Sequence, residues 1–231
     1  MTKENKSKSD KKSLIIRIIA IILLVAGIVL IFNKPIGDWM IRQNQQSTLS
    51  SLTKKKVEAN KKKKGMFDFS KVKDMDAAKA TKTRLKNTAN AIGALAIPDV
   101  NMYLPIMLGL SDDSLSTGGG TMRANQTMGK GNYPLAGHYM TSNGILFSPL
   151  ENTQLGQKVY LTDLKHIYIY RIYMKKKVDP HAVYLVRNTK KAIVTLITCA
   201  DGGVNRWAVR GKLIDTEKAT NKNLQVFKLN S

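Results

Sequence analysis

The stretch Ala192-Ile193-Val194-Thr195-Leu196-Ile197-Thr198-Cys199 is followed directly by Ala200-Asp201-Gly202-Gly203. Branched aliphatic and threonine side chains are typical of a half-buried strand, and the polar, glycine-containing stretch predicts a turn. Cys199 is therefore expected at the end of a strand, where a thiol can meet a substrate. The alternative is that this free cysteine is a small hydrophobic residue of the core, as many free cysteines are.

Segments of the same character recur from Ala91 to the C-terminus, separated by turn residues. Eight strands are predicted, at Ile92–Ile97, Tyr103–Leu108, Tyr133–His138, Lys158–Leu161, Lys165–Met174, Ala182–Val186, Ala192–Cys199 and Arg206–Ile214. Single helical turns are predicted at Ser111–Ser116 and Ser148–Thr153, and a turn at Gly118–Gly120. Eight short strands with little helix favour a closed barrel or a sandwich, and about 140 residues suffice to bury one core.

The N-terminal part has a different character. From Leu14 to Phe32 every residue except Arg17 is apolar, Ala or Gly, and these nineteen residues match the length of a transmembrane helix. Five lysines precede the stretch, so the positive-inside rule predicts a cytoplasmic N-terminus, residues 1–13, and an extracellular remainder. A cleaved signal peptide is the alternative, but the run is longer than usual and lacks a small-x-small cleavage site.

The formal net charge of +22 is distributed unevenly. Residues 51–90 carry thirteen basic and four acidic residues, net +9, so much of the excess precedes the expected globular part. Residues 33–69 are interpreted as a basic, solvated stalk, and Ser70–Asn90 as a helix that leads into a catalytic domain at 70–231. Because the basic segments are expected outside the cell or against the membrane, no role in nucleic-acid binding is predicted.

A cysteine nucleophile needs a base and a group that stabilises an oxyanion. Three histidines are available: His138 at a predicted strand end, His166 inside a strand, and His181 in a Lys-rich loop. Arg206 opens the strand after Cys199, and strand ends joined by a short loop lie side by side. Arg210 shares its face but is expected about 13 Å further along, which makes it the weaker candidate.

Together these residues resemble the motifs of class A sortases, the enzymes that fix proteins to the cell wall of Gram-positive bacteria. The motifs are Thr195–Cys199 followed by Arg206, Leu135–His138, Ala96–Val100 with Leu104–Ile106, and Gly129–Tyr133. The resemblance covers roughly residues 90–214. It implies a closed eight-stranded β-barrel behind a transmembrane helix and a stalk.

The resemblance also implies the chemistry. Cys199 is the nucleophile that cleaves a Leu-Pro-any-Thr-Gly sorting signal between Thr and Gly, His138 is the acid and base, and Arg206 stabilises the oxyanion. A peptidoglycan-precursor amine (lipid II) resolves the acyl-enzyme. Substrate-lining residues are expected to be Thr198, Ile197, Leu185 and Val186.

Neither a metal nor a cofactor is expected. One branch of class A sortases is stimulated by calcium, which takes six to eight oxygen ligands. Here the loop from Val178 to Lys191 has only Asp179 as an acidic residue, and Asp112 and Asp113 are interpreted as helix-capping residues. The loop is therefore expected to be ordered by packing alone.

Two other functions stay open from the sequence. A hydrolytic cysteine protease would give only an acid as product, but the Gln-Ala-Cys motif of caspases is absent and the order of histidine and cysteine is opposite to that of papain. A non-catalytic wall-binding module would keep its function after Cys199→Ala.

Overall fold

The computed structural model describes residues 4–68, 90–142 and 144–229. The chain forms two compact units, Met1–Gly37 and Asp38–Ser231. The first unit is the N-terminal part of helix α1 (Glu4–Ser50), and the second carries the remainder of α1 and all of the strands. The helix predicted at Ser70–Asn90 lies outside the described residues except for its last residue, and the predicted domain boundaries stay predictions.

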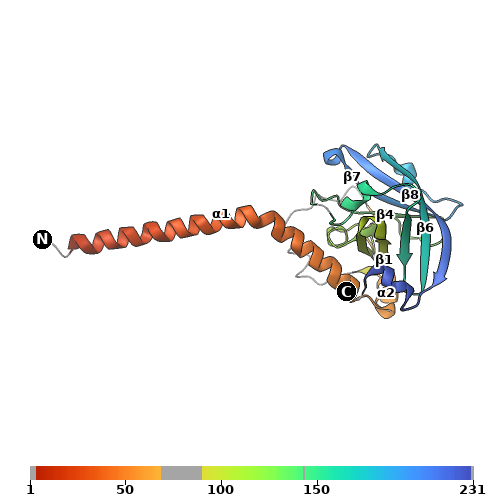
Figure 1. Ribbon diagram of the computed structural model, residues 1–231, viewed down its shortest axis with the longest axis horizontal. Helices are drawn as coiled ribbons and strands as arrows, with labels where there is room; N and C mark the ends of the chain where they lie inside the picture. Colours follow the sequence, from red (N-terminus) through yellow and green to blue (C-terminus); the bar gives the residue numbers. More distant parts are fainter. Residues whose placement is uncertain (1–3, 69–89, 143, 230–231) are drawn as a thin grey trace. The chain divides into compact units, whose positions relative to one another are not determined.

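The second unit contains a closed β-barrel (Figure 1). Its strands are β1 (Ala91–Ile97), β2 (Met102–Met107), β3 (Gly119–Thr121), β4 (Asn132–Ala136), β5 (Lys158–Thr162), β6 (His166–Val178), β7 (Ile193–Ala200) and β8 (Asn205–Lys218). Their order around the barrel is β1-β2-β3-β4-β7-β8-β6-β5, and β5 pairs with β1 to close it. Short helices lie between strands: η2 (Pro98–Val100), α4 (Asp112–Leu115), η3 (Ser148–Asn152), η4 (Val183–Val186) and η5 (Asp201–Gly203). A further one, η6 (Asn223–Phe227), follows β8. The predicted eight-stranded barrel is confirmed.

One predicted strand is wrong and one strand was missed. Residues 182–186 form the 3-10 turn η4, in which Leu185 N donates to Ala182 O at 3.0 Å. A short apolar run fits a buried turn as well as a strand, so periodicity alone could not separate them. The predicted turn at Gly118–Gly120 lies mostly in strand β3, and a Cβ on Gly118 would stand 2.1 Å from Pro105 O. These glycines allow close backbone approach, which the sequence also permits in a turn.

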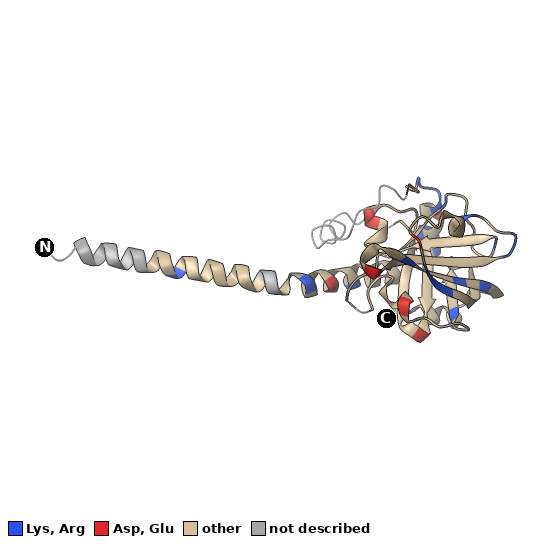
Figure 2. Ribbon diagram, turned by 90° about the horizontal axis from the view of Figure 1, so that it is seen from above, with Lys and Arg blue, Asp and Glu red and all other residues tan. Residues whose placement is uncertain are grey.

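Strands β6 and β8 are longer than predicted. They pair antiparallel from His166↔Lys218 to Val178↔Arg206, with two register shifts. The extra length of β6 includes the lysine run 175–177, whose composition gave no strand signal. Basic residues of the barrel are blue in Figure 2.

The barrel interior is the hydrophobic core. Its buried cluster includes Leu95, Leu135, Tyr170, Leu196 and Val209, drawn from five strands. Inward residues alternate with outward ones along each strand, as the period of two requires. A second cluster of Leu185, Ile197 and Ala208 lies on the other face of β7 and β8, under η4.

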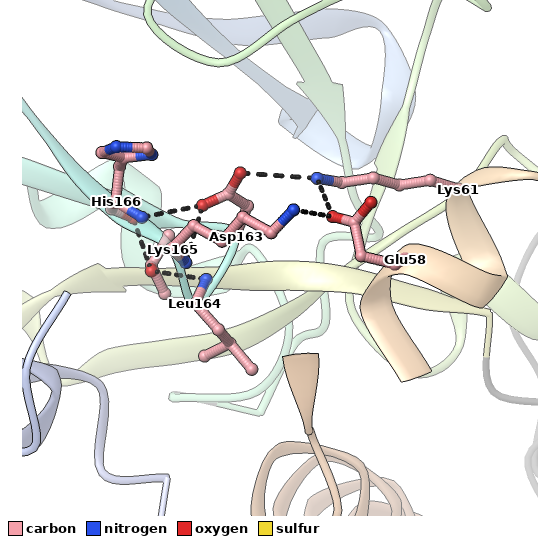
Figure 3. Close-up of polar contacts among 7 residues, drawn as sticks. Glu58, Lys61, Asp163, Leu164, Lys165 and His166 are labelled. Atoms are coloured by element: carbon pink, nitrogen blue, oxygen red, sulfur yellow. Dashed lines mark hydrogen bonds and ion pairs between the residues drawn. The ribbon is translucent and has the colours of Figure 1, made fainter. Parts of the chain in front are cut away.

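Helix α2 (Lys54–Lys61) packs on the barrel through Val57, which is buried with Leu49, Ala94 and Phe227. Ion pairs join Lys61 to Glu58 (3.2 Å) and Asp163 (3.4 Å), and Lys165 to Glu58 (3.2 Å), as Figure 3 shows. The sequence gave no sustained apolar stripe between residues 39 and 60, so these packed helices were not predicted.

Helix α1 covers the apolar stretch Leu14–Phe32, whose described large side chains are exposed. Arg17 is its sole charged residue, and the stretch shows almost no charge in Figure 2. In the part of the chain that the structure describes, no helix reaches the length and hydropathy of a membrane span.

Candidate active site

Strands β4 and β7 end, and β8 begins, at the same edge of the barrel, with β7 between β4 and β8 (Figure 1). Cys199 is the next-to-last residue of β7, and its Cα partner across the antiparallel pair with β8 is Arg206. Residues directly opposite each other in such a pair point to the same face, with Cβ atoms about 4.5–5.5 Å apart. The structure thus brings Arg206 beside Cys199.

His138 lies on the other side of Cys199. Strand β4 runs parallel to β7 in a register that ends with Ala136↔Ile197. The segments that follow this last pair stay hydrogen-bonded to each other. Gly137 N donates to Ile197 O at 3.1 Å, and Thr198 Oγ1 donates to Gly137 O at 2.8 Å. His138 follows Gly137, so the same register places its backbone beside that of Cys199, at the spacing of neighbouring strands, about 4.8 Å.

Backbone and side-chain contacts hold the segment that carries His138. Phe147 N donates to His138 O at 3.0 Å. Tyr139 Oη donates to Glu151 Oε1 at 2.8 Å. The hydrogen bond to this carboxylate, followed by burial and charge repulsion, raises the pKa of Tyr139. These contacts therefore hold the backbone that carries His138. The histidine itself lies two residues past the end of β4, and not within the strand as predicted.

Cys199 is half-buried and faces away from the barrel interior. Val194 and Leu196 of β7 belong to the interior core, whereas Ile197 packs with Leu185 on the opposite face. Since side chains alternate along a strand, Cys199 shares the face of Ile197. Cys199 is therefore not part of the interior core of the barrel, and its role as the nucleophile stays a prediction.

The guanidinium of Arg206 is held by the β7–β8 loop. Its Nη1 donates to Gly203 O at 2.6 Å and to Asn205 O at 3.0 Å. Asp201 ties the same loop to Lys177 at 2.5 Å and accepts from Asn205 Nδ2 at 2.9 Å; these two contacts lower the pKa of Asp201. A guanidinium has five N–H donors, so two contacts through Nη1 leave donors for a substrate carbonyl.

A family model described as the sortase domain matches residues 95–214. The chain belongs to the sortase family. Sortase A from Streptococcus agalactiae serotype III (strain NEM316) is 41% identical over 192 residues, which cover 80% of this chain and 78% of that protein. Sortase A from Listeria monocytogenes serovar 1/2a (strain ATCC BAA-679 / EGD-e) is 36% identical over 206 residues, 87% of this chain and 93% of that protein.

The solved structure of Listeria monocytogenes sortase A has a TM-score of 0.58 to this chain at 40% identity, and covers 61% of this chain and 98% of that one. The barrel is thus the fold of the family. As a sortase, the protein is a cysteine transpeptidase that anchors surface proteins.

Three of the four predicted substrate-lining residues of the sortase gather on the face of the barrel wall that Cys199 shares. Leu185 is buried against Ile197, and Val186 packs at the edge of the same cluster. Thr198 is 2% exposed, and its hydroxyl binds the backbone that carries His138. Thr198 therefore lies beneath the site, and its contact with substrate stays a prediction.

The other two histidines lie apart from the cysteine. His166 opens β6, at the opposite end of that strand from Val178, which pairs with Arg206. His181 is exposed in the loop before η4, where its backbone N–H donates to Asp179 Oδ1 at 2.7 Å. Both are exposed surface residues of the sortase.

Metal ligation finds little support among the residues that the structure describes, because they contain no group of three or more His, Cys, Asp or Glu placed to hold an ion. Asp112 and Asp113 lie in the first turn of α4, but the cap is Ser111, whose Oγ accepts from Ser114 N at 3.2 Å. Metal-independent catalysis stays a prediction.

Sequence reasoning missed the hydrogen bonds that hold η4. Asn132 and Arg210 both donate to Leu185 O, each at 2.8 Å, so the expectation of a loop ordered by packing alone is wrong. Asn132 lies within the quoted motif Gly129–Tyr133, but a lone asparagine at a strand start is also an ordinary turn residue. Its role depends on contacts with residues more than fifty positions away.

Proposed function

We propose that this sortase cleaves a Leu-Pro-any-Thr-Gly sorting signal between Thr and Gly and transfers the Thr carbonyl to the amine of a peptidoglycan precursor. The observation that carries the proposal is the position of Cys199 on β7, between His138 just after β4 on one side and Arg206 of β8 on the other. A nucleophile flanked by a base and a cation is the arrangement that acyl transfer needs.

Cys199 supplies the nucleophile. A cysteine transpeptidase needs a thiolate, and Cys199 is the single cysteine of the sequence. Its Sγ attacks the Thr carbonyl carbon, and the C–N bond to Gly breaks to leave a thioester. The acceptor amine then attacks that thioester, a new C–N bond forms, and the thiolate leaves.

His138 moves the protons of both half-reactions. Its imidazolium gives a proton to the departing Gly amine, and the resulting imidazole takes a proton from the incoming amine. Arg206 donates to the oxygen that becomes negative in each tetrahedral intermediate, because a guanidinium beside the reacting carbonyl stabilises the developing charge.

The apolar cluster under η4 supports the choice of substrate. Its centre, Leu185, Ile197 and Ala208, is buried, and half-buried Val178 and Val186 at its edge leave apolar surface for a ligand. An apolar surface with a few polar groups suits the Leu-Pro part of such a signal.

The sortase is also proposed to be a single-pass membrane protein with the catalytic domain on the extracellular face. The support is the apolar stretch Leu14–Phe32, its exposed side chains, and the lysines that precede it. Protease added to wall-permeable cells is expected to release the domain, and a protected domain would refute this orientation.

The test of the reaction uses the full chain in detergent with a Leu-Pro-any-Thr-Gly peptide and a triglycine amine, read by mass spectrometry. A sortase gives a peptide with a new amide to the amine. A product that contains only the free acid would instead support a hydrolytic protease, and unchanged function in Cys199→Ala would support a binding module.

A further inference from the structure

A closed ring of hydrogen bonds links the barrel wall to η4. Arg210 Nε donates to Thr195 Oγ1 at 3.2 Å, and Thr195 Oγ1 donates to Asn132 Oδ1 at 2.7 Å. Asn132 Nδ2 donates to Leu185 O at 2.8 Å, and Arg210 Nη2 donates to the same oxygen at 2.8 Å. Residues of β4 and β8 thus donate to one carbonyl of η4, and Thr195 of β7 links the two donors.

The chemistry of the ring allows a single arrangement. Arginine can only donate, so the Thr195 oxygen accepts from it and must give its own proton to Asn132. The Asn132 carbonyl oxygen is then committed to Thr195, and its NH2 group faces the loop. There it also donates to Arg187 O at 2.9 Å.

Burial makes this ring costly to break. Asn132 and Thr195 are 0% exposed and Leu185 is 2% exposed. A buried donor or acceptor that loses its partner pays its full desolvation penalty. Two further hydrogen bonds hold the segment that follows η4. Asn188 Oδ1 accepts from Asn132 N at 3.2 Å and from Arg123 Nη2 at 3.3 Å.

We propose that Asn132, Thr195 and Arg210 are positioning residues that hold η4 closed on the barrel, so that the apolar cluster around Leu185 is formed before substrate arrives. This rests on the proposed function, in which the half-buried edge of that cluster, with Val178 and Val186, receives the Leu-Pro part of the signal. A binding surface that is closed in only a fraction of the molecules binds more weakly in proportion to that fraction. Loss of the ring therefore raises KM and leaves the chemical step unchanged.

The test is Arg210→Met, which keeps the aliphatic stem and removes the donors. The expected result is a KM for the Leu-Pro-any-Thr-Gly peptide raised about tenfold, equivalent to about 1.4 kcal/mol, with kcat within about twofold. Hydrogen exchange of the free protein is expected to speed up at residues 183–187 and to stay unchanged in the barrel strands. Arg210→Lys, which keeps one donor group, is expected to restore part of the affinity.

The matched control is Lys212→Met, which removes a positive charge two residues along the same face of β8. It is expected to change neither KM nor exchange at residues 183–187. Asn132→Asp keeps the size of the side chain but places a carboxylate oxygen against the carbonyls of Leu185 and Arg187. It should speed up exchange at residues 183–187 more than Arg210→Met does.

The proposal is overturned if Arg210→Met leaves exchange at residues 183–187 unchanged. It is also overturned if exchange rises throughout the barrel and kcat falls while KM rises. Exchange is measured without substrate. If the wild-type chain left the peptide uncleaved, the proposed function would fail while exchange would still decide whether the ring holds η4.

Discussion

At the scale of residues, the position of Cys199 explains why its two neighbours are assigned different tasks. Arg206 is opposite it on β8, and His138 follows β4 on the other side. The adjacency of Cys199 and Arg206 could be predicted from the short loop between two strands. Position in the sequence alone could not single out His138 among the three histidines, because β4 and β7 pair across about sixty residues of sequence. The resemblance to class A sortases identified it.

His138→Ala is expected to lower kcat/KM by at least about a hundredfold, because proton transfer by a positioned side chain contributes at least that much. His166→Ala and His181→Ala serve as matched controls, since both residues are exposed. The three rates are compared in the same peptide-transfer assay. Equal losses in all three variants would show that His138 is not the acid and base.

Arg206→Lys is expected to lower kcat strongly, on the order of a hundredfold, because it keeps the charge but loses the planar fork of donors. Lysine also has a different reach to Gly203 O, which Arg206 contacts at 2.6 Å. Steady-state kinetics separate this effect from that of Arg210, whose variants should change KM. A loss of kcat in Arg210→Lys with normal Arg206→Lys would transfer the oxyanion role to Arg210.

At the scale of elements, the strands with strong local signals were predictable and those set by tertiary contacts were not. The branched run 192–199 gave β7 to within one residue at each end. β3 has three residues, two of them glycine, and exists because β2 and β4 flank it. The turn η4 is fixed by hydrogen bonds from residues of two distant strands, β4 and β8, which no local pattern encodes.

The turn that carries Asp163, together with the ion pair from Asp163 to Lys61 of α2, predicts a pH dependence of stability (Figure 3). Burial would raise the pKa of Asp163, but hydrogen bonds from the backbone of His166 and Lys165 and the Lys61 ammonium outweigh it, so the pKa lies below its ordinary value of 3.8. Such a group adds stability above about pH 5, and this is lost as the pH falls through the lowered pKa.

Asp163→Asn is therefore expected to lower the Tm at pH 7 and to reduce the drop in Tm between about pH 5 and pH 3. Asp215→Asn, at an exposed carboxylate of β8, is the control and should follow the wild type. Thermal unfolding by circular dichroism at several pH values measures both. Parallel curves for Asp163→Asn and the wild type would mean that this carboxylate contributes nothing to the pH dependence.

At the scale of the whole molecule, the loop that bears Leu185 is held by donors from the protein itself. Its carbonyls accept from Asn132 and Arg210, and a cation would compete for the same oxygens. The domain is also net positive, since residues 91–231 carry seventeen basic and nine acidic residues. Both features disfavour a divalent ion near the site.

Transfer rates are therefore expected to be equal, within about twofold, with added calcium and with a chelator. The rates are measured with the same peptide and amine at one protein concentration. A severalfold loss on adding chelator would show that an ion orders the loop after all.

The central claim is that Cys199 carries the acyl group during transfer. The most direct measurement is the intact mass of the full chain mixed with a Leu-Pro-any-Thr-Gly peptide, with no amine acceptor, followed by peptide mapping. The predicted result is an adduct of the Leu-Pro-any-Thr acyl group on Cys199 that disappears when triglycine is added and never forms in Cys199→Ala. An adduct that persists in Cys199→Ala would contradict the account.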